Sequence, residues 1–271
     1  MSNQTPHHPQ PDQQQLAESM SKISKKLLVL SGKGGVGKST VATNIAFALA
    51  DAGKKVGLLD VDVHGPSIPR LTGLAGQQTG ASQGKIEPIA ISENLKVMSV
   101  AFLLSDDNQA VIWRGPMKYS AISQMLADTD WGELDYLVID APPGTGDEPL
   151  SVAQLVGENA SAVVVTTPQM LATGDVKRCI SFCKLLNLSI AGIVENMAGL
   201  VCPHCNETIN IFGNDGGKAL AQHYDLELLG SIPLDPAICA GGDMGKTISE
   251  AKTQEVTAKA FEEIITKIQN S

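Results

Sequence analysis

Short apolar runs alternate with longer segments rich in helix-forming residues from Lys25 to the C-terminus. The run Leu-Leu-Val-Leu at residues 27–30 has no polar alternation, which is typical of a strand buried on both faces of a parallel sheet. Strands that alternate with helices predict βαβ units, and hence an α/β, doubly wound, mainly parallel sheet with helices on both faces. The predicted strands cover residues 26–31, 55–60, 95–100, 134–140, 161–166, 189–195 and 227–231. The predicted helices cover residues 38–52, 117–128, 148–156, 173–187, 215–224 and 254–269.

The last predicted helix is amphipathic, because its large apolar residues recur at spacings of three and four. Residues 251–271 contain three lysines and three glutamates, so the helix lacks the basic excess of a membrane-docking helix. We therefore expect its apolar face to pack on the body of the protein. That face consists of Phe261, Ile264, Ile265 and Ile268.

The N-terminal segment does not follow the alternating pattern. Residues 1–22 are rich in Gln, Pro, Ser and His and show no periodicity, so we expect a disordered polar tail there. The remaining residues, 23–271, are expected to form a single domain, since no internal repeat or second compositional boundary is present.

One glycine-rich segment carries a specific chemical signal. Residues 32–39 read Gly-Lys-Gly-Gly-Val-Gly-Lys-Ser and fit G-x-x-x-x-G-K-[ST], the phosphate-binding loop of nucleotide triphosphatases. It follows a predicted strand and precedes a predicted helix, as this motif requires. Lys38 is expected to reach the β- and γ-phosphates of ATP, and the Ser39 hydroxyl is expected to bind Mg²⁺. The expected nucleotide-binding residues are Gly32, Lys33, Gly34, Gly35, Val36, Gly37, Lys38, Ser39 and Thr40.

Aspartates follow two predicted strands on the edge of the sheet that carries the phosphate loop. Asp60 and Asp62 end the second strand, and Asp140 ends the fourth. A carboxylate at this edge can hold Mg²⁺ and a second one can orient the attacking water. We expect Asp140 to serve the magnesium ion and Asp62 to orient the water. Lys33, a second lysine early in the loop, is expected to contact phosphate.

Composition and charge narrow the classes of partner. The chain of 271 residues is 43% hydrophobic and only 4% aromatic, which suits a sheet built on Val, Ile, Leu and Ala. Its formal net charge of −9 makes it a poor non-specific binder of nucleic acid or anionic membrane, so neither partner is expected. The sequence has no apolar run of about eighteen residues and no secretory signal, so a cytoplasmic location is expected.

Cys202 and Cys205 form a C-x-x-C pair after a predicted strand. This spacing lets both thiolates bind one metal centre, and a two-fold dimer would complete a four-thiolate set. Three alternatives remain open for the pair: a bridging iron–sulfur cluster, a zinc ion, or a redox or inert dithiol. Cys179 and Cys183 lie at i and i+4 on a predicted helix and are expected to be packing thiols. Cys239 is expected to be a structural residue in a loop.

Several stretches together resemble the Mrp/ApbC group of iron–sulfur cluster carriers, within the superfamily of MinD, ParA and the nitrogenase iron protein. The first is Lys-Gly-Gly-Val-Gly-Lys-Ser-Thr at residues 33–40, a deviant phosphate loop. The other matching stretches cover residues 60–69, 113–117, 140–147, 194–197 and 202–205.

The resemblance implies a homodimer that encloses ATP and has weak ATPase activity. It also implies that a 4Fe-4S cluster bridges the two subunits and is delivered to recipient apo iron–sulfur proteins. It also implies that Lys33 reaches the nucleotide of the other subunit and that Asn196 contacts the adenine. Lys33, Lys38 and Asp62 are then the expected catalytic residues. Two other functions remain open: a positioning ATPase of the MinD or ParA kind, and a zinc-stabilised nucleotide-binding interaction module.

Overall fold

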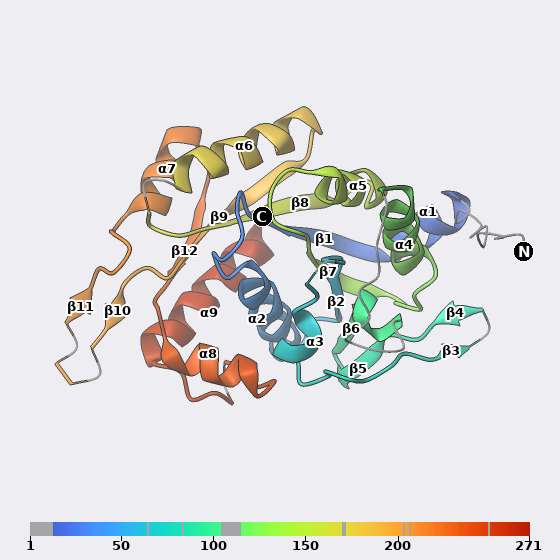
Figure 1. Cartoon of the computed structure of the whole chain (residues 1–271), viewed down its shortest axis with the longest axis horizontal. Coiled ribbons are helices and arrows are strands. Elements are labelled where there is room, and N and C mark those ends of the chain that lie inside the picture. The colour runs from blue at the N-terminus through green and yellow to red at the C-terminus, as the bar shows by residue number, and fades with distance from the viewer. Residues whose placement is uncertain are drawn as a thin grey trace, which may run out of the picture.

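A single large sheet forms the centre of the computed structural model, in which residues 13–63, 65–82, 84–103, 115–169, 172–202, 204–205, 207–248 and 250–271 are described (Figure 1). The sheet has eight strands in the order β12-β9-β8-β1-β7-β2-β6-β5. All neighbouring pairs are parallel except the edge pair of β5 and β6. Its strands are β1 (Ile23–Leu30), β2 (Val56–Asp60), β5 (Ile89–Ser92), β6 (Leu95–Ser99), β7 (Leu134–Asp140), β8 (Ala160–Thr166), β9 (Ser189–Asn196) and β12 (Leu228–Ile232).

The prediction of a doubly wound, mainly parallel sheet is confirmed, and each of the seven predicted strands is present. The strands that the sequence did not predict are short. β5 has four residues with half-buried and exposed positions in alternation, so it lacks the continuous apolar run of the inner strands. The others are two-residue strands in two hairpins, where no periodicity can be read: β3 (Ala81–Ser82), β4 (Lys85–Ile86), β10 (Leu200–Val201) and β11 (Thr208–Ile209).

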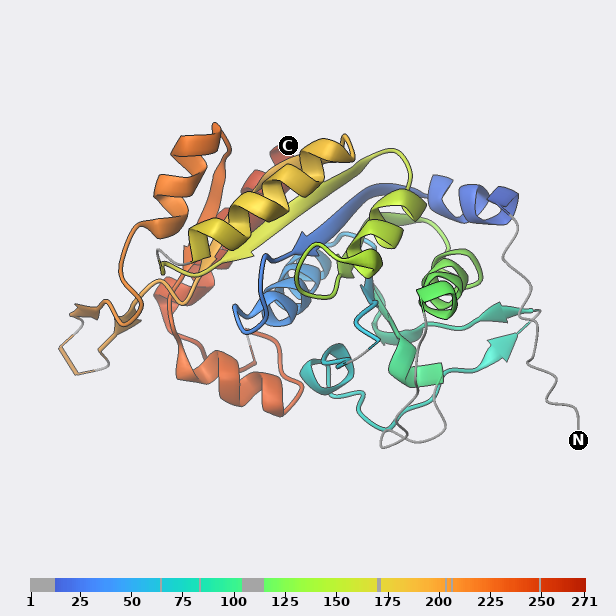
Figure 2. The same cartoon turned by 45° about the horizontal axis from the view of Figure 1, so that its top comes forward.

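Helices cover both faces of the sheet (Figures 1 and 2). α2 (Lys38–Asp51) and α9 (Glu255–Asn270) lie on one face, with α3 (Ile68–Leu71) and α8 (Pro236–Asp243) beside them. The other face carries α4 (Gly115–Ala127), α5 (Asp147–Leu155), α6 (Ala172–Leu185) and α7 (Gly216–Tyr224). A short 3₁₀ helix, η1 (Val100–Leu103), follows β6. This arrangement places the carboxyl ends of the parallel strands, where ligands bind in such sheets, along one edge.

The N-terminal prediction is wrong for part of the tail, because α1 (Gln13–Ser21) is a helix. Leu16 and Met20, one helical turn apart, pack against the core, and Met20 is only 4% exposed. The Ser19 hydroxyl donates to the carbonyl oxygen of Leu126 on α4 at 3.0 Å. Two large apolar residues in a mostly polar segment were too weak a periodic signal to reveal this docked helix. Residues 1–12 lie outside the described residues.

The prediction for the C-terminal helix is confirmed. Phe261, Ile264, Ile265 and Ile268 are all buried, and α9 packs on β12 and α2. In the described parts of the chain, no helix is both long enough and apolar enough to cross a membrane.

Candidate functional site

The phosphate loop connects β1 to α2 at the carboxyl edge of the sheet, as the motif predicts. Gly35 and Gly37 have φ values of 79° and 81°, in the left-handed region that favours glycine. A Cβ on Gly37 would also overlap the amide nitrogen of Asn196, and a Cβ on Gly32 would overlap the backbone of Asp175 in α6. These close approaches leave no space for side chains at Gly32 and Gly37, so the loop is held against β9 and α6.

Lys38 and Asp140 form a buried ion pair at the base of this loop. The Lys38 Nζ atom donates to Asp140 Oδ1, and the two side chains are 7% and 0% exposed. Lys38 Nζ also lies 3.4 Å from the Ser39 hydroxyl. Lys38 begins α2 and Asp140 ends β7, so the first helical turn and a central strand bring the two charges together. The loop lysine is therefore neutralised by the carboxylate predicted to serve Mg²⁺.

The surroundings of Asp140 fit a hard cation. Its Oδ2 atom is buried and has no hydrogen-bond partner among the described residues, which is costly for a carboxylate. Burial raises the pKa of the Asp140 carboxyl, while the Lys38 ammonium and the Ser39 hydroxyl beside it oppose this rise. Mg²⁺ takes oxygen ligands, one or two of them from protein side chains. The free carboxylate oxygen of Asp140 and the hydroxyl of Ser39 supply that chemistry.

Asp60 and Asp62 lie in different environments, although they are only two residues apart in the sequence. Asp60 is 0% exposed, and its carboxylate accepts hydrogen bonds from the backbone N–H groups of Asp62 at 3.1 Å and Ile68 at 3.2 Å. The hydroxyl of Ser99 lies 3.3 Å from the same carboxylate. Burial, followed by the nearby charge of Asp140, raises the pKa of Asp60 to about 8. Asp60 thus anchors both ends of the loop that carries Asp62, a structural role that the sequence did not predict.

An open pocket of about 320 Å³ lies over the phosphate loop. Lys33, Lys38, Ser39 and Thr40 line it, and their contact with phosphate remains a prediction. Asp62 lines it as well, half-buried, and its Oδ1 atom accepts from the backbone N–H of Gly65 at 3.3 Å. The opposite wall, from α3 and the turn after β7, contains Ser67, Arg70, Leu71 and Pro143. The sequence analysis assigned no role to any of these four residues, although Ser67 and Pro143 lie within the matching stretches 60–69 and 140–147.

Two further predicted residues lie close to the loop. The Lys33 Nζ atom donates at 3.3 Å to Oε1 of Gln169, three residues after the end of β8. The Asn196 side-chain amide donates to the carbonyl oxygen of Val36 at 2.9 Å and is buried under the loop. Asn196 therefore supports the loop backbone directly in this structure. Its adenine contact and the reach of Lys33 across a dimer remain predictions.

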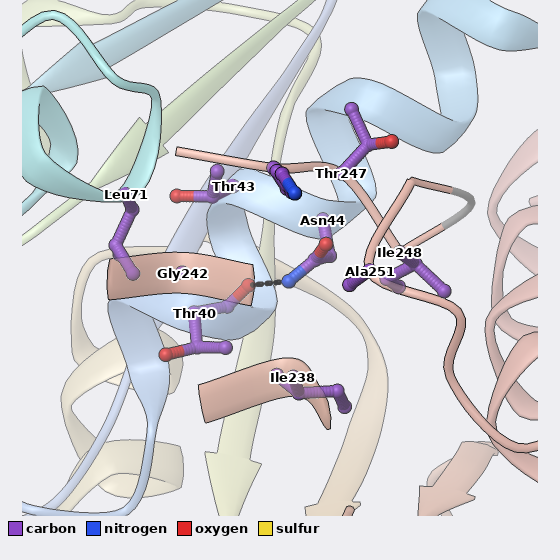
Figure 3. A pocket seen from close by; sticks show the side chains of 10 residues that line it. Thr40, Thr43, Asn44, Leu71, Ile238, Gly242, Thr247, Ile248 and Ala251 are labelled. Carbon is purple, nitrogen blue, oxygen red and sulfur yellow. Dashed lines mark hydrogen bonds between the residues drawn. The ribbon is translucent and has the colours of Figure 1, made fainter. Parts of the chain in front are cut away.

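A second, much smaller cavity lies behind α2 (Figure 3). Thr40, Thr43 and Asn44 of α2 line one side of it, facing Leu71, and α8 closes the other side. The Asn44 side chain donates to the Thr40 carbonyl oxygen at 2.8 Å, the dashed line in Figure 3. The volume of this cavity, about 10 Å³, is close to the minimum for one water molecule. The region is therefore a packing contact rather than a ligand site.

The cysteine pair lies on the hairpin of β10 and β11, which projects from the body of the molecule (Figure 1). Cys202 is half-buried and Cys205 is exposed. The backbone N–H groups of His204 and Cys205, followed by the Cys205 thiol, lower the pKa of Cys202, although burial opposes this effect. A lowered pKa favours the thiolate, which is the form that binds metal. Pro203 and Asn206, within and just after the pair, lie outside the described residues.

The hairpin supplies only part of a metal site by itself. Among the residues that the structure describes, no three His, Cys, Asp or Glu side chains are grouped so that they could hold a metal ion. The Cys205 thiol lies 3.9 Å from Glu207 Oε2, and the backbone N–H of Cys202 donates to the Glu207 carbonyl oxygen at 2.9 Å. Two exposed or half-exposed thiols on a projecting hairpin are therefore available to a ligand set completed from outside this chain.

The other three cysteines differ in burial. Cys179 and Cys183 are buried in the core on α6, as packing thiols should be, and a hydrogen bond between them, together with burial, raises the pKa of Cys179. The prediction that Cys239 lies in a loop is wrong, because it is an exposed residue of α8. Asp235 starts that helix by accepting from the Ala237 N–H at 2.9 Å, and Pro236 occupies the first turn. The two following glycines masked this helix in the sequence.

Comparisons of the sequence with a family model and with known relatives agree on one protein family. A family model described as ParA, NUBPL iron-transfer P-loop NTPase, matches residues 22–269. An iron–sulfur cluster carrier protein of Methanocaldococcus jannaschii is 47% identical over 94% of this chain and 88% of its own length. A homologue of the cytosolic Fe-S cluster assembly factor NUBP2 from Trichoplax adhaerens is 50% identical over 92% of this chain and 95% of its own length.

Solved structures extend the comparison to the fold. A nucleotide-binding protein of Archaeoglobus fulgidus, solved in complex with ADP, has a TM-score of 0.78 and 41% identity, covering 87% of this chain and 92% of that chain. The cell division ATPase MinD of Pyrococcus furiosus has a TM-score of 0.61 and 25% identity, covering 91% of this chain and 99% of that chain. The described stretches of the motifs noted in the sequence lie within the family match, while residues 64, 113–114 and 203 of those motifs lie outside the described part of the chain.

Proposed function

The chain belongs to the NUBPL iron-transfer P-loop NTPase family, and from this membership we propose that it binds and hydrolyses ATP and carries an iron–sulfur cluster to apoproteins. The single observation that supports the carrier role best is the projecting hairpin with Cys202 and Cys205. The hairpin offers two accessible thiols on a domain that also has a nucleotide pocket. Relatives of this chain are named as cluster carriers or cluster assembly factors, which agrees with this role.

The cluster is the cargo of the proposed function, and a homodimer would hold it. A 4Fe-4S cluster takes four thiolates, while the described chain groups only two accessible cysteines at the hairpin. A two-fold axis repeats the same pair, so two hairpins facing each other would supply Cys202 and Cys205 twice. Exposed thiolates at the tip of a hairpin also suit release, because the cluster stays within reach of a recipient apoprotein. Such a carrier would act in the cytoplasm.

ATP would bind in the pocket over residues 32–40, with Asn196 beside the adenine. When phosphates enter, Lys38 would exchange its contact with Asp140 for the terminal phosphates, which releases the carboxylate. Asp140 and Ser39 would then hold Mg²⁺, which neutralises phosphate charge. The buried and unpaired Oδ2 of Asp140 supports this assignment, because a cation would satisfy it.

For weak hydrolysis, Asp62 would orient the attacking water and Lys33 would contact the nucleotide bound by the other subunit. Asp62 faces the pocket, and its loop is fastened by two hydrogen bonds to the buried Asp60. A carboxylate held in this way has a restricted position, which favours orientation of a water molecule. Lys33 is also a pocket residue, and its present contact is a long hydrogen bond to Gln169. A single such bond is weak enough to be exchanged for phosphate.

Anaerobic reconstitution with iron and sulfide tests the carrier role. Iron, sulfide and zinc are measured per dimer, together with the elution volume on size exclusion. We expect about four irons per dimer in the wild type, the number of a four-iron cluster with Cys₄ ligation. Cys202→Ala or Cys205→Ala should abolish loading and leave ATP binding intact, because each change removes two of four ligands from a symmetric dimer.

Cys179→Ala and Cys239→Ala are the matched controls, one buried and one exposed, and both should retain iron. Full iron retention without Cys202 and Cys205 would refute the assignment of the pair. Zinc alone in the wild type under iron-replete anaerobic conditions would favour the zinc-stabilised module instead. Transfer to an apo iron–sulfur protein, followed by the activity of the recipient, then tests delivery itself.

A further inference from the structure

Arg70 is a basic residue of the nucleotide pocket to which neither the motif nor the family resemblance assigns a role. It lies on α3, directly after the loop that carries Asp62, and lines the pocket together with Lys33 and Lys38. Its side chain is exposed, and among the described residues it forms no hydrogen bond or ion pair. The guanidinium is therefore free to bind a ligand that enters the pocket.

The charges around this pocket favour an anion. Among the described residues, the basic side chains of Lys33, Lys38 and Arg70 and the acidic side chain of Asp62 line it, while Lys38 is already paired with the buried Asp140. The positive charges of Lys33 and Arg70 therefore exceed the single negative charge of Asp62 in this lining. The chain as a whole has the opposite balance, with a formal net charge of −9. Like charges close together repel each other unless an anion lies between them. An unpaired arginine at this position therefore gains most from a polyphosphate.

The position of Arg70 is fixed by its neighbours, although its own side chain is free. At the start of α3, the backbone N–H of Ile68 donates to the buried carboxylate of Asp60 at 3.2 Å. At the end of α3, Leu71 lies against α8, where a Cβ on Gly242 would be only 2.9 Å from its Cδ2 atom (Figure 3). α3 is thus fastened at both ends, so Arg70 is held at the pocket wall by rigid contacts.

We propose that Arg70 is a further nucleotide-binding residue, which donates to the terminal phosphate of ATP. The inference rests on the proposed ATP-binding function and extends it. The terminal phosphate is the target because Arg70 shares its wall with the loop of Asp62, the residue assigned to the attacking water, whereas the loop glycines surround the inner phosphates. The planar fork of a guanidinium matches two phosphate oxygens at once, which an ammonium does not.

Calorimetric titrations with ADP and with a non-hydrolysable ATP analogue, each with Mg²⁺, measure the two affinities. Comparing them distinguishes a contact to the terminal phosphate from contacts to the inner phosphates. Arg70→Ala should weaken binding of the analogue by roughly ten- to a hundredfold, the range of hydrogen bonds to charged groups, and should change ADP binding by less than about threefold. Arg70→Lys should restore part of the loss, because the charge remains and the fork does not. Lys259→Ala is the matched control, since it removes one positive charge from the exposed surface of α9, away from the pocket lining.

An equal loss for ADP and the analogue, or no loss for either, would overturn the assignment of Arg70 to the terminal phosphate. Because Arg70 is exposed, the variant should fold normally, and an unchanged midpoint of thermal unfolding checks this. Iron loading at Cys202 and Cys205 should also be retained in Arg70→Ala. A wild-type protein that binds no nucleotide would refute the proposed function itself, whereas a normal wild type with an unaffected variant would refute only the role of Arg70.

Discussion

Replacing Lys38 should destabilise the nucleotide-free protein in a way that depends on pH. Lys38→Met keeps most of the side-chain volume but removes the charge that faces Asp140, whose own side chain is 0% exposed. Breaking a buried ion pair by removing one partner costs about 3–5 kcal/mol, because the remaining charge is left without compensation. The variant can limit this cost by keeping Asp140 protonated.

Protonation of Asp140 limits how much free energy of unfolding the Lys38→Met variant can lose. The carboxyl group has an ordinary pKa of 3.8, and holding it protonated costs about 1.36 kcal/mol for each pH unit above that value. This limit is therefore about 4.4 kcal/mol at pH 7 and about 1.6 kcal/mol at pH 5. Burial raises the pKa of Asp140 in the wild type, and the loss of Lys38 raises it further. When the pKa of Asp140 is higher in the folded than in the unfolded state, its contribution to the free energy of unfolding is complete below the unfolded pKa and is lost as pH rises. The destabilisation of the variant therefore grows from pH 5 to pH 7.

Urea unfolding at pH 5 and pH 7, with EDTA and without nucleotide, measures this penalty. Lys38→Met/Asp140→Asn is the matched control, because the amide removes the buried charge and should recover most of the loss at pH 7. Asp140→Asn alone should be destabilised, since it leaves Lys38 buried without its counter-charge. A penalty of equal size at both pH values, or one that the double variant does not recover, would refute the reasoning.

Two further predictions concern hydrolysis. Lys33→Ala should leave the fold intact, because the described side-chain contact of Lys33 is one hydrogen bond of 3.3 Å to Gln169. It should lower the ATPase rate, because Lys33 lines the pocket. Steady-state phosphate release measures the rate, and a wild-type rate would contradict the proposed contact across a dimer. Asp62→Asn should reduce kcat more than it weakens ATP binding, because a group that orients water contributes mainly in the transition state. Single-turnover hydrolysis and ATP titration compare the two effects, and equal losses would place Asp62 in the binding shell instead.

Local sequence patterns were enough to predict the phosphate loop and seven of the eight strands of the central sheet. Both depend on local patterns: continuous apolar runs for strands that are buried on both faces, and a fixed spacing of glycines, lysine and serine for the loop. Asp140 was identifiable in the same way, because it directly follows one of those runs. The sequence also identified the cysteine pair, since the spacing of two ligands within one turn is a local property.

The tertiary structure decided which residues meet from different elements. The pairing of Lys38 with Asp140 joins positions 102 residues apart, and no local pattern encodes that contact. Asp60 proved to be an anchor because Ile68 and Ser99 converge on its carboxylate, and Arg70 entered the pocket because α8 holds α3 in place. The short helices α1 and α8 were likewise missed. Their stability comes from packing and capping contacts, such as Met20 in the core and Asp235 at the start of α8, rather than from periodicity.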